Sequence, residues 1–211
     1  KLRYLPLETS FRSAYAYDNV LYTVAGELLE AVTDKTWEAF VTERILVPVG
    51  MDDATLRRGE IEQGNVAATH ARVDGTVQHV PPFVFANTTP AGGISASATD
   101  MARWMIVQLD SGRVAGGERL FSPRTTTELW DIVTPIRPGR YPADLKAWQP
   151  QMQGYALGFN VRDYRGVKIV THTGGLPGYL SQVTLVPALK LGVAVLTNQE
   201  AGEAFTAVTN H

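Results

Sequence analysis

Two helices are predicted near the start of the chain from the spacing of its apolar positions. Over residues 20–32, apolar side chains recur every three or four positions, as on a helix with one apolar face. Asp18 or Asn19 is placed to cap the first turn of this helix. A second pattern over residues 36–47 runs into Pro48 and Gly50, which are both typical helix stop signals.

The middle of the chain contains two irregular stretches. Residues 52–95 are rich in turn-forming dipeptides, and we expect long loops there, with short strands near residues 66–73 and 77–80. Residues 134–153 contain four prolines and no apolar period, which favours an insertion or a lid over a site.

Between these stretches, two further helices are indicated by their start signals. Ser97 and Asp100 have the spacing of a capping box, ahead of a helix that would run to about residue 109. Ser122 followed by Pro123 predicts another helix, with the serine as cap and the proline in the first turn.

The last third of the chain changes to patterns typical of strands. Short turns separate some of these segments, and such short connections make neighbouring strands antiparallel. Helices followed by an antiparallel meander predict an α+β fold, a sheet flanked by helices. The expected strands are residues 155–162, 167–172, 180–186 and 191–196.

Composition narrows the functions that such a domain could have. The 211 residues are 45% hydrophobic, enough for a proper core. A formal net charge of −2 argues against binding nucleic acid through its phosphates. No apolar run is long enough for a membrane span, and the absence of cysteine excludes disulfides and thiolate metal sites.

The histidines give no sign of a metal site. His70 and His79 lack the i, i+4 spacing of a metal-binding pair on a helix, and surface or loop positions are expected for both. The sequence therefore predicts neither a bound metal nor a cofactor.

Two short motifs carry the candidate chemistry, Tyr17-Asp18-Asn19 and His172-Thr173-Gly174-Gly175. Taken alone, the first could be a tyrosine beside a helix cap, and the second a histidine that ends a strand before a glycine turn. Together they resemble the second and third motifs of the family of class C β-lactamases and penicillin-binding-protein-like enzymes. Further segments resemble that family in the same order along the chain, namely residues 17–55, 90–102, 172–178 and 191–198.

This resemblance implies a role for each motif residue. Tyr17 would be the general base that activates a serine nucleophile. His172, where lysine is usual, would help to hold substrate and stabilise charge, and the N–H of Gly175 would form half of an oxyanion hole. The substrate-contacting residues would be Asn19, Thr173, Gly174 and Gly175.

The resemblance also implies a fold and an activity. Residues 1–211 would form a single but partial domain of the β-lactamase/transpeptidase-like fold, with its N-terminal part missing. The activity would be hydrolysis of a lactam, D-peptide or ester carbonyl through an acyl-enzyme. Such enzymes act on small-molecule or peptide substrates, and a periplasmic or secreted bacterial protein is expected.

The first motif of that family, Ser-x-x-Lys, is absent from this sequence. None of its seven serines has a lysine three residues later. A triad of Ser95, Asp163 and His172 follows the chain order of an α/β-hydrolase, but no buried strand is expected directly before Ser95. We therefore expect this chain alone to be inactive, and the alternative is a non-catalytic ligand-binding or regulatory domain derived from the fold.

The ends of the sequence also suggest an incomplete domain. The chain begins with Lys1 rather than methionine, and it stops within what could be a helix. If a preceding segment normally completes the sheet, exposed strand edges could drive association of this chain.

Overall fold

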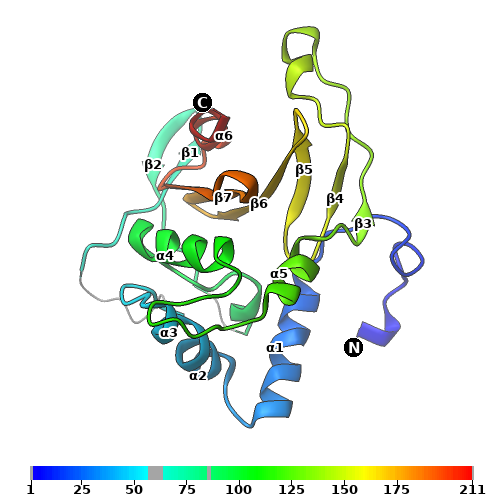
Figure 1. Cartoon of the computed structure of the whole chain (residues 1–211). Helices are drawn as coiled ribbons and strands as arrows, with labels where there is room; N and C mark the ends of the chain where they lie inside the picture. Colours follow the sequence, from blue (N-terminus) through cyan, green and yellow to red (C-terminus); the bar gives the residue numbers. More distant parts are fainter. Residues whose placement is uncertain (1, 57–63, 85–86, 211) are drawn as a thin grey trace.

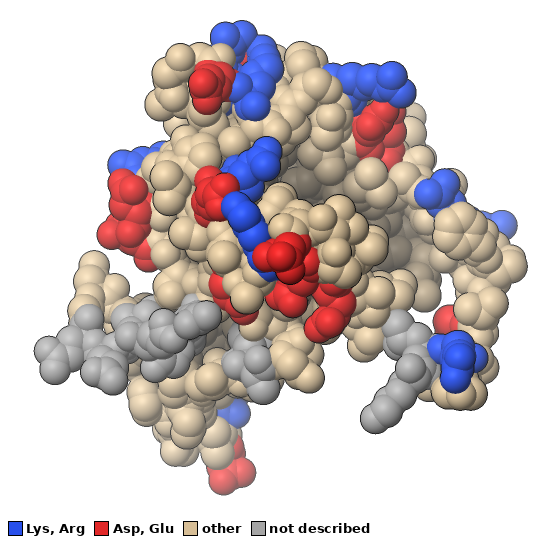
Figure 2. Space-filling model, turned by 90° about the horizontal axis from the view of Figure 1, so that it is seen from below, with Lys and Arg blue, Asp and Glu red and all other residues tan. Residues whose placement is uncertain are grey.

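The fold is an α+β arrangement in which helices pack against an antiparallel sheet (Figure 1). The computed structural model describes residues 2–56, 64–84 and 87–210. Within those ranges, no helix combines the length and the apolar character needed to cross a membrane. Basic and acidic side chains are interspersed on the face seen in Figure 2, which carries no extended area of one sign.

The main sheet follows the chain order, as the sequence predicts. In the described residues it has six strands in the order β3-β4-β5-β6-β7-β8, and each strand pairs antiparallel with the next. Its strands are β3 (Thr134–Pro135), β4 (Gln153–Tyr155), β5 (Asn160–Tyr164), β6 (Val167–Leu176), β7 (Tyr179–Val186) and β8 (Leu191–Thr197). A separate hairpin pairs β1 (His70–Val73) with β2 (Thr76–His79).

The helices lie before the sheet in the sequence, except for the last one. The α-helices are α1 (Val20–Thr33), α2 (Trp37–Val41), α3 (Val47–Val49), α4 (Ala98–Leu109), α5 (Pro123–Trp130) and α6 (Gly202–Asn210). A π-helical segment, η2 (Thr42–Leu46), joins α2 to α3. Short 3₁₀ turns are η1 (Leu2–Tyr4), η4 (Thr89–Ala91), η5 (Ala143–Trp148) and η6 (Pro187–Leu189).

Helix α4 links the two parts of the hydrophobic core. Its Val107 belongs to a cluster formed mainly with residues between Val41 and Leu56, and its Met105 belongs to a cluster under the sheet. Val170 and Leu185, on β6 and β7, are fully buried in the second cluster. Burying each such side chain contributes about 1.5–3 kcal/mol, so α4 and the sheet are held together mainly by apolar contact.

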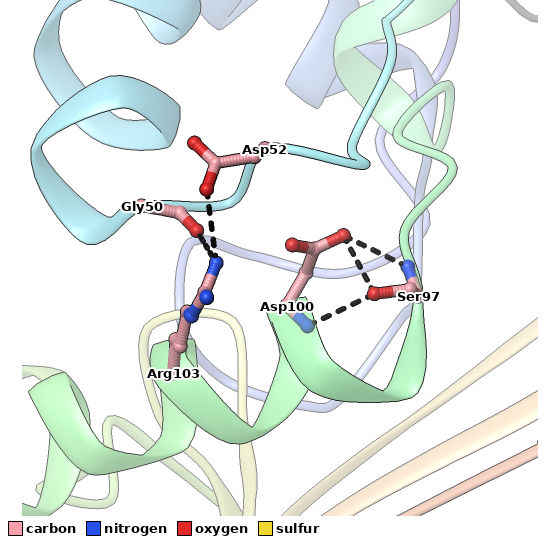
Figure 3. Close-up of polar contacts among 5 residues, drawn as sticks. All are labelled: Gly50, Asp52, Ser97, Asp100 and Arg103. Atoms are coloured by element: carbon pink, nitrogen blue, oxygen red, sulfur yellow. Dashed lines mark hydrogen bonds and ion pairs between the residues drawn. The ribbon is translucent and has the colours of Figure 1, made fainter.

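Polar contacts fix both the start and the middle of α4 (Figure 3). The capping box expected from the sequence is present: Asp100 N donates to Ser97 Oγ at 3.1 Å, and Ser97 N donates to Asp100 Oδ2 at 3.0 Å. One turn later, the Arg103 guanidinium donates to the carbonyl oxygen of Gly50 and, at 3.2 Å, to Asp52 Oδ2. These bonds tie α4 to the end of α3.

The predicted helix ends are correct except at Pro48. The helix starting after Thr36 continues through Pro48 and ends at Gly50, whose φ of 75° is left-handed. Proline has no N–H to donate to the preceding turn, and the chain widens into the π-helical segment η2 just before it. The sequence signal was therefore correct for glycine and wrong for proline.

Each predicted strand overlaps a strand of the structure, but the number of strands and some of their limits differ from the prediction. Residues 155–162 form not one strand but the ends of β4 and β5, joined by a turn in which Gly158 has a φ of 82°. Strand β6 continues past residue 172 to Leu176, and residues 66–69 precede β1 rather than belong to it.

The segment between β3 and β4 extends away from the sheet (Figure 1). It contains η5, and the Trp148 ring at the end of η5 stacks on Tyr164 with ring centres 5.0 Å apart. Whether residues 134–153 act as a lid stays a prediction.

Candidate active site

The structure brings Tyr17 and His172 together, although 155 positions separate them in the sequence (172 − 17). Their ring centres are 6.1 Å apart. Tyr17 lies just before α1, where Asp18 Oδ1 accepts a hydrogen bond from Val20 N at 2.8 Å. Asp18 therefore supplies the side-chain bond expected at this helix start, whereas Asn19 occupies the cap position without making one. The Asn19 side chain has no capping role that would keep it from a ligand.

His172 lies where β6 passes the end of its neighbour β5. The pairing of β5 with β6 stops at Asn160 and Thr171, whereas the pairing of β6 with β7 continues to Leu176. Within the described residues, one edge of β6 therefore has no strand partner from His172 to Leu176. An extended peptide or a substrate amide can bind such an edge through main-chain hydrogen bonds.

Thr173, Gly174 and Gly175 continue β6 along this open edge, and all three are exposed. On the other side they pair with Gln182, Ser181 and Leu180 of β7. A Cβ on Gly174 would lie 2.5 Å from Ser181 Oγ, so a glycine lets the two strands approach without displacing that serine.

Tyr155 of β4 is a site residue that the sequence reasoning missed. Its hydroxyl lies 3.0 Å from His172 Nε2. His172 Nδ1 lies 2.7 Å from the carbonyl oxygen of Thr173, which can only accept, so Nδ1 carries the proton of this bond. In the neutral imidazole, Nε2 is then the acceptor and Tyr155 the donor.

Burial favours that donor role. It raises the pKa of Tyr155 well above its ordinary value, and the nearby Tyr22 hydroxyl adds to the effect. Tyr155 is therefore a phenol at neutral pH and holds the His172 ring in place. No motif in the sequence pointed to Tyr155, because the turn before β5 that aligns it with Asn160 and Thr171 was not predicted.

Tyr17 is also a phenol in this chain. Burial raises its pKa, and Tyr22 contributes in the same direction. Tyr15 adds another ring, 5.1 Å from Tyr155 between centres. The site is thus an aromatic cluster around one imidazole, and its environment opposes the phenolate that a general base requires.

The positions of Ser95 and Asp163 do not support a triad with His172. Ser95 exchanges backbone hydrogen bonds with Thr55 at 2.9 Å. Asp163 lies opposite Lys168, four positions along β6 from His172, and accepts hydrogen bonds from the backbone N–H groups of residues 151 and 152. The bond from Met152 is the main reason that the pKa of Asp163 is lowered.

The aromatic cluster lacks the set of side chains that a metal site requires. In the part of the chain that the structure describes, no group of three or more His, Cys, Asp or Glu side chains could hold a metal ion.

Comparison of the fold identifies its class. A penicillin-binding protein homologue from Pyrococcus abyssi, described as octameric, superposes with a TM-score of 0.76 over 91% of this chain and 40% of that one, at 21% sequence identity. A D-stereospecific amidohydrolase from Streptomyces sp. gives 0.69 over 92% of this chain and 54% of that one, at 19% identity. The chain has the β-lactamase/transpeptidase-like fold.

The chain belongs to the Beta-lactamase family, whose model matches residues 1–211. Among curated relatives, the Unguisins hydrolase ungD of Aspergillus violaceofuscus is 28% identical over 207 residues. That alignment covers 93% of this chain but only 36% of the fungal protein. The chain therefore spans about a third of the length of this relative, and the family resemblance inferred from the sequence is confirmed.

Proposed function

We propose that this chain is the part of a serine hydrolase that carries the general base and the substrate-binding edge, and that the nucleophile comes from a Ser-x-x-Lys motif outside it. The observation that carries the proposal is the meeting of Tyr17, His172 and the open edge of β6. The substrate would be a lactam, a D-peptide or amide, or an ester.

The proposed reaction has two similar halves. The serine Oγ bonds to the substrate carbonyl carbon while Tyr17, as phenolate, takes the serine proton. Collapse of the intermediate breaks the bond to the leaving nitrogen or oxygen, which receives that proton from Tyr17. Water then attacks the acyl-serine ester in the same way and releases the acid. In both halves the N–H of Gly175 would help to stabilise the oxyanion.

The raised pKa of Tyr17 means that, to act as a base, Tyr17 would need a nearby positive charge. An ordinary tyrosine is ionised in only about one molecule in a thousand at pH 7, and burial makes Tyr17 a still weaker acid. A lysine beside it, as in Ser-x-x-Lys, would favour the phenolate. The five lysines of this chain all lie outside such a motif.

The exposed apolar face of α1 supports the idea that a further segment packs on this helix in the proposed longer protein. Val24, Leu28 and Val32 follow one another at four-residue spacing and are 42%, 64% and 76% exposed. Strand β8 has no partner on its outer edge in the described residues. A helix stripe and a strand edge of this kind are normally covered in a finished domain.

Covalent labelling tests the proposal. We expect no adduct when this chain is incubated with a penicillin or a fluorophosphonate and its intact mass is measured. Labelling of any of its serines would refute the proposal that the nucleophile lies outside this chain.

In the longer protein, Tyr17→Phe should slow acylation by about 10²–10⁴-fold, since a general base contributes that much. Tyr4→Phe is the matched control, because Tyr4 is 73% exposed. Unchanged acylation in Tyr17→Phe would remove Tyr17 as the base.

The lack of any Ser-x-x-Lys in these 211 residues also favours a second function, a binding domain that keeps the pocket without the nucleophile. The sequence of the parent gene upstream of Lys1 decides between the two. A Ser-x-x-Lys there supports the hydrolase, and its absence supports the binding domain.

A further inference from the structure

The β1–β2 hairpin places two histidines side by side. His70 and His79 are direct cross-strand partners, with ring centres 6.0 Å apart and ring planes at 83°. The His70 N–H donates to Asn198 O at 3.1 Å rather than across the hairpin. The two histidines therefore form a non-hydrogen-bonded pair, the type whose side chains approach most closely.

One imidazole of the pair is already oriented. His70 Nδ1 lies 3.1 Å from Asn198 O and 3.4 Å from Asn198 Nδ2. The shorter of these two contacts is to the carbonyl oxygen, which can only accept, so we assign the proton to His70 Nδ1. Nε2 of His70 then has a free lone pair, and metal-binding histidines are commonly oriented by this type of bond to a backbone carbonyl.

The hairpin that carries the pair is firmly attached to the sheet. His70 N donates to Asn198 O just after β8 and approaches Gly178 O at 3.4 Å, where β6 turns into β7, and Asn198 Nδ2 donates to Ala68 O just before β1. The nearest cation on the same face, Arg72, points toward the turn, because its guanidinium donates to Gly75 O at 2.9 Å. No positive charge on the hairpin is thus directed at the two imidazoles.

We propose that His70 and His79 together bind one borderline divalent cation of the Zn²⁺, Cu²⁺ or Ni²⁺ class. Each imidazole supplies one nitrogen, and water completes the coordination. Imidazole is a good ligand for these ions. With metal–nitrogen distances of about 2.0–2.1 Å, the ring centres would lie roughly 5 Å apart, so a small rotation of the exposed His79 ring closes the site.

A two-imidazole site of this kind is open and exchangeable. The bound ion would join the two strands of the hairpin next to Gly178, three residues beyond Gly175 of the open β6 edge. The site is independent of the hydrolase proposal, because it uses no residue assigned to the reaction.

Copper binding by the 211-residue chain tests this inference. Cu²⁺ is titrated into chelator-stripped protein, and the electron paramagnetic resonance spectrum is recorded. We expect one tight equivalent with hyperfine coupling to two imidazole nitrogens. His70→Gln and His79→Gln should each weaken its binding by about tenfold or more, given that even partners of ligands cost 10–100-fold, and the double variant should be little weaker than either single one.

A positional control keeps the composition constant. Combining His79→Gln with Gln78→His keeps the number of histidines constant but places the second imidazole on the opposite face of the hairpin. This variant should lose the site, whereas His172→Gln and His211→Gln should keep it. Retained affinity in the shifted variant, or loss of affinity in His172→Gln, would overturn the proposal.

Discussion

At the scale of single residues, the tyrosines of the aromatic cluster should make stability depend on alkaline pH. Burial raises the pKa of Tyr155, Tyr17 and Tyr15 in the folded chain. A raised pKa means that the folded state keeps its protons longer than the unfolded state. The resulting stability is fully present below the ordinary tyrosine pKa of about 10, and it is lost as pH rises above that value.

We expect urea midpoints to fall above about pH 10. Tyr155→Phe should flatten this fall, since Tyr155 has the largest shift of the three. At neutral pH the same change removes the donor to His172 and should cost about 1 kcal/mol. Tyr4→Phe, which removes an exposed phenol, should leave the pH profile unchanged. An equally steep fall in Tyr155→Phe would show that the buried phenol is not its source.

At the scale of elements, Gly178 determines how the β1–β2 hairpin attaches to the sheet. Gly178 has a φ of 81°, and a Cβ there would lie 2.5 Å from Thr69 Cβ and 2.9 Å from His70 N. Gly75, in the hairpin turn, has the same φ of 81° but nothing within 4 Å of its Cβ position. The two glycines thus share one backbone conformation and differ in the space around them.

Alanine at each glycine separates strain from overlap. Gly75→Ala should lower the free energy of unfolding by about 1 kcal/mol, the strain of a left-handed residue. Gly178→Ala should lose about 1–3 kcal/mol more, because backbone and Thr69 must move. Urea unfolding of both variants measures the difference. Equal losses would mean that the hairpin is not held against Gly178.

The sequence predicted those features that are decided by neighbouring residues, and it missed those that depend on contacts between distant segments. Caps such as Ser97 with Asp100, and Ser122 before α5, were predicted correctly because each is decided within four residues. Tyr155 could not be found, because its contact with His172 depends on register across three strands. The proximity of Tyr17 and His172 came only from family resemblance, since no local pattern joins residues so distant.

At the scale of the whole molecule, the apolar face of α1 distinguishes a finished domain from a partial one. In this chain Leu28 is 64% exposed, so Leu28→Lys should change the free energy of unfolding by no more than about 0.5 kcal/mol. The exposed stripe should promote association of the chain, and Leu28→Lys should reduce that association in sedimentation velocity.

In the longer protein that the proposed function requires, the same substitution should be strongly destabilising. If a preceding segment covers α1, Leu28→Lys buries an unpaired charge and should cost several kcal/mol of unfolding free energy. Leu189→Lys is the matched control, because Leu189 is 67% exposed and lies in η6, between β7 and β8. Equal tolerance of both substitutions in the longer protein would mean that α1 stays exposed, and that the nucleophile of the proposed hydrolase would have to reach Tyr17 without a segment packed on this helix.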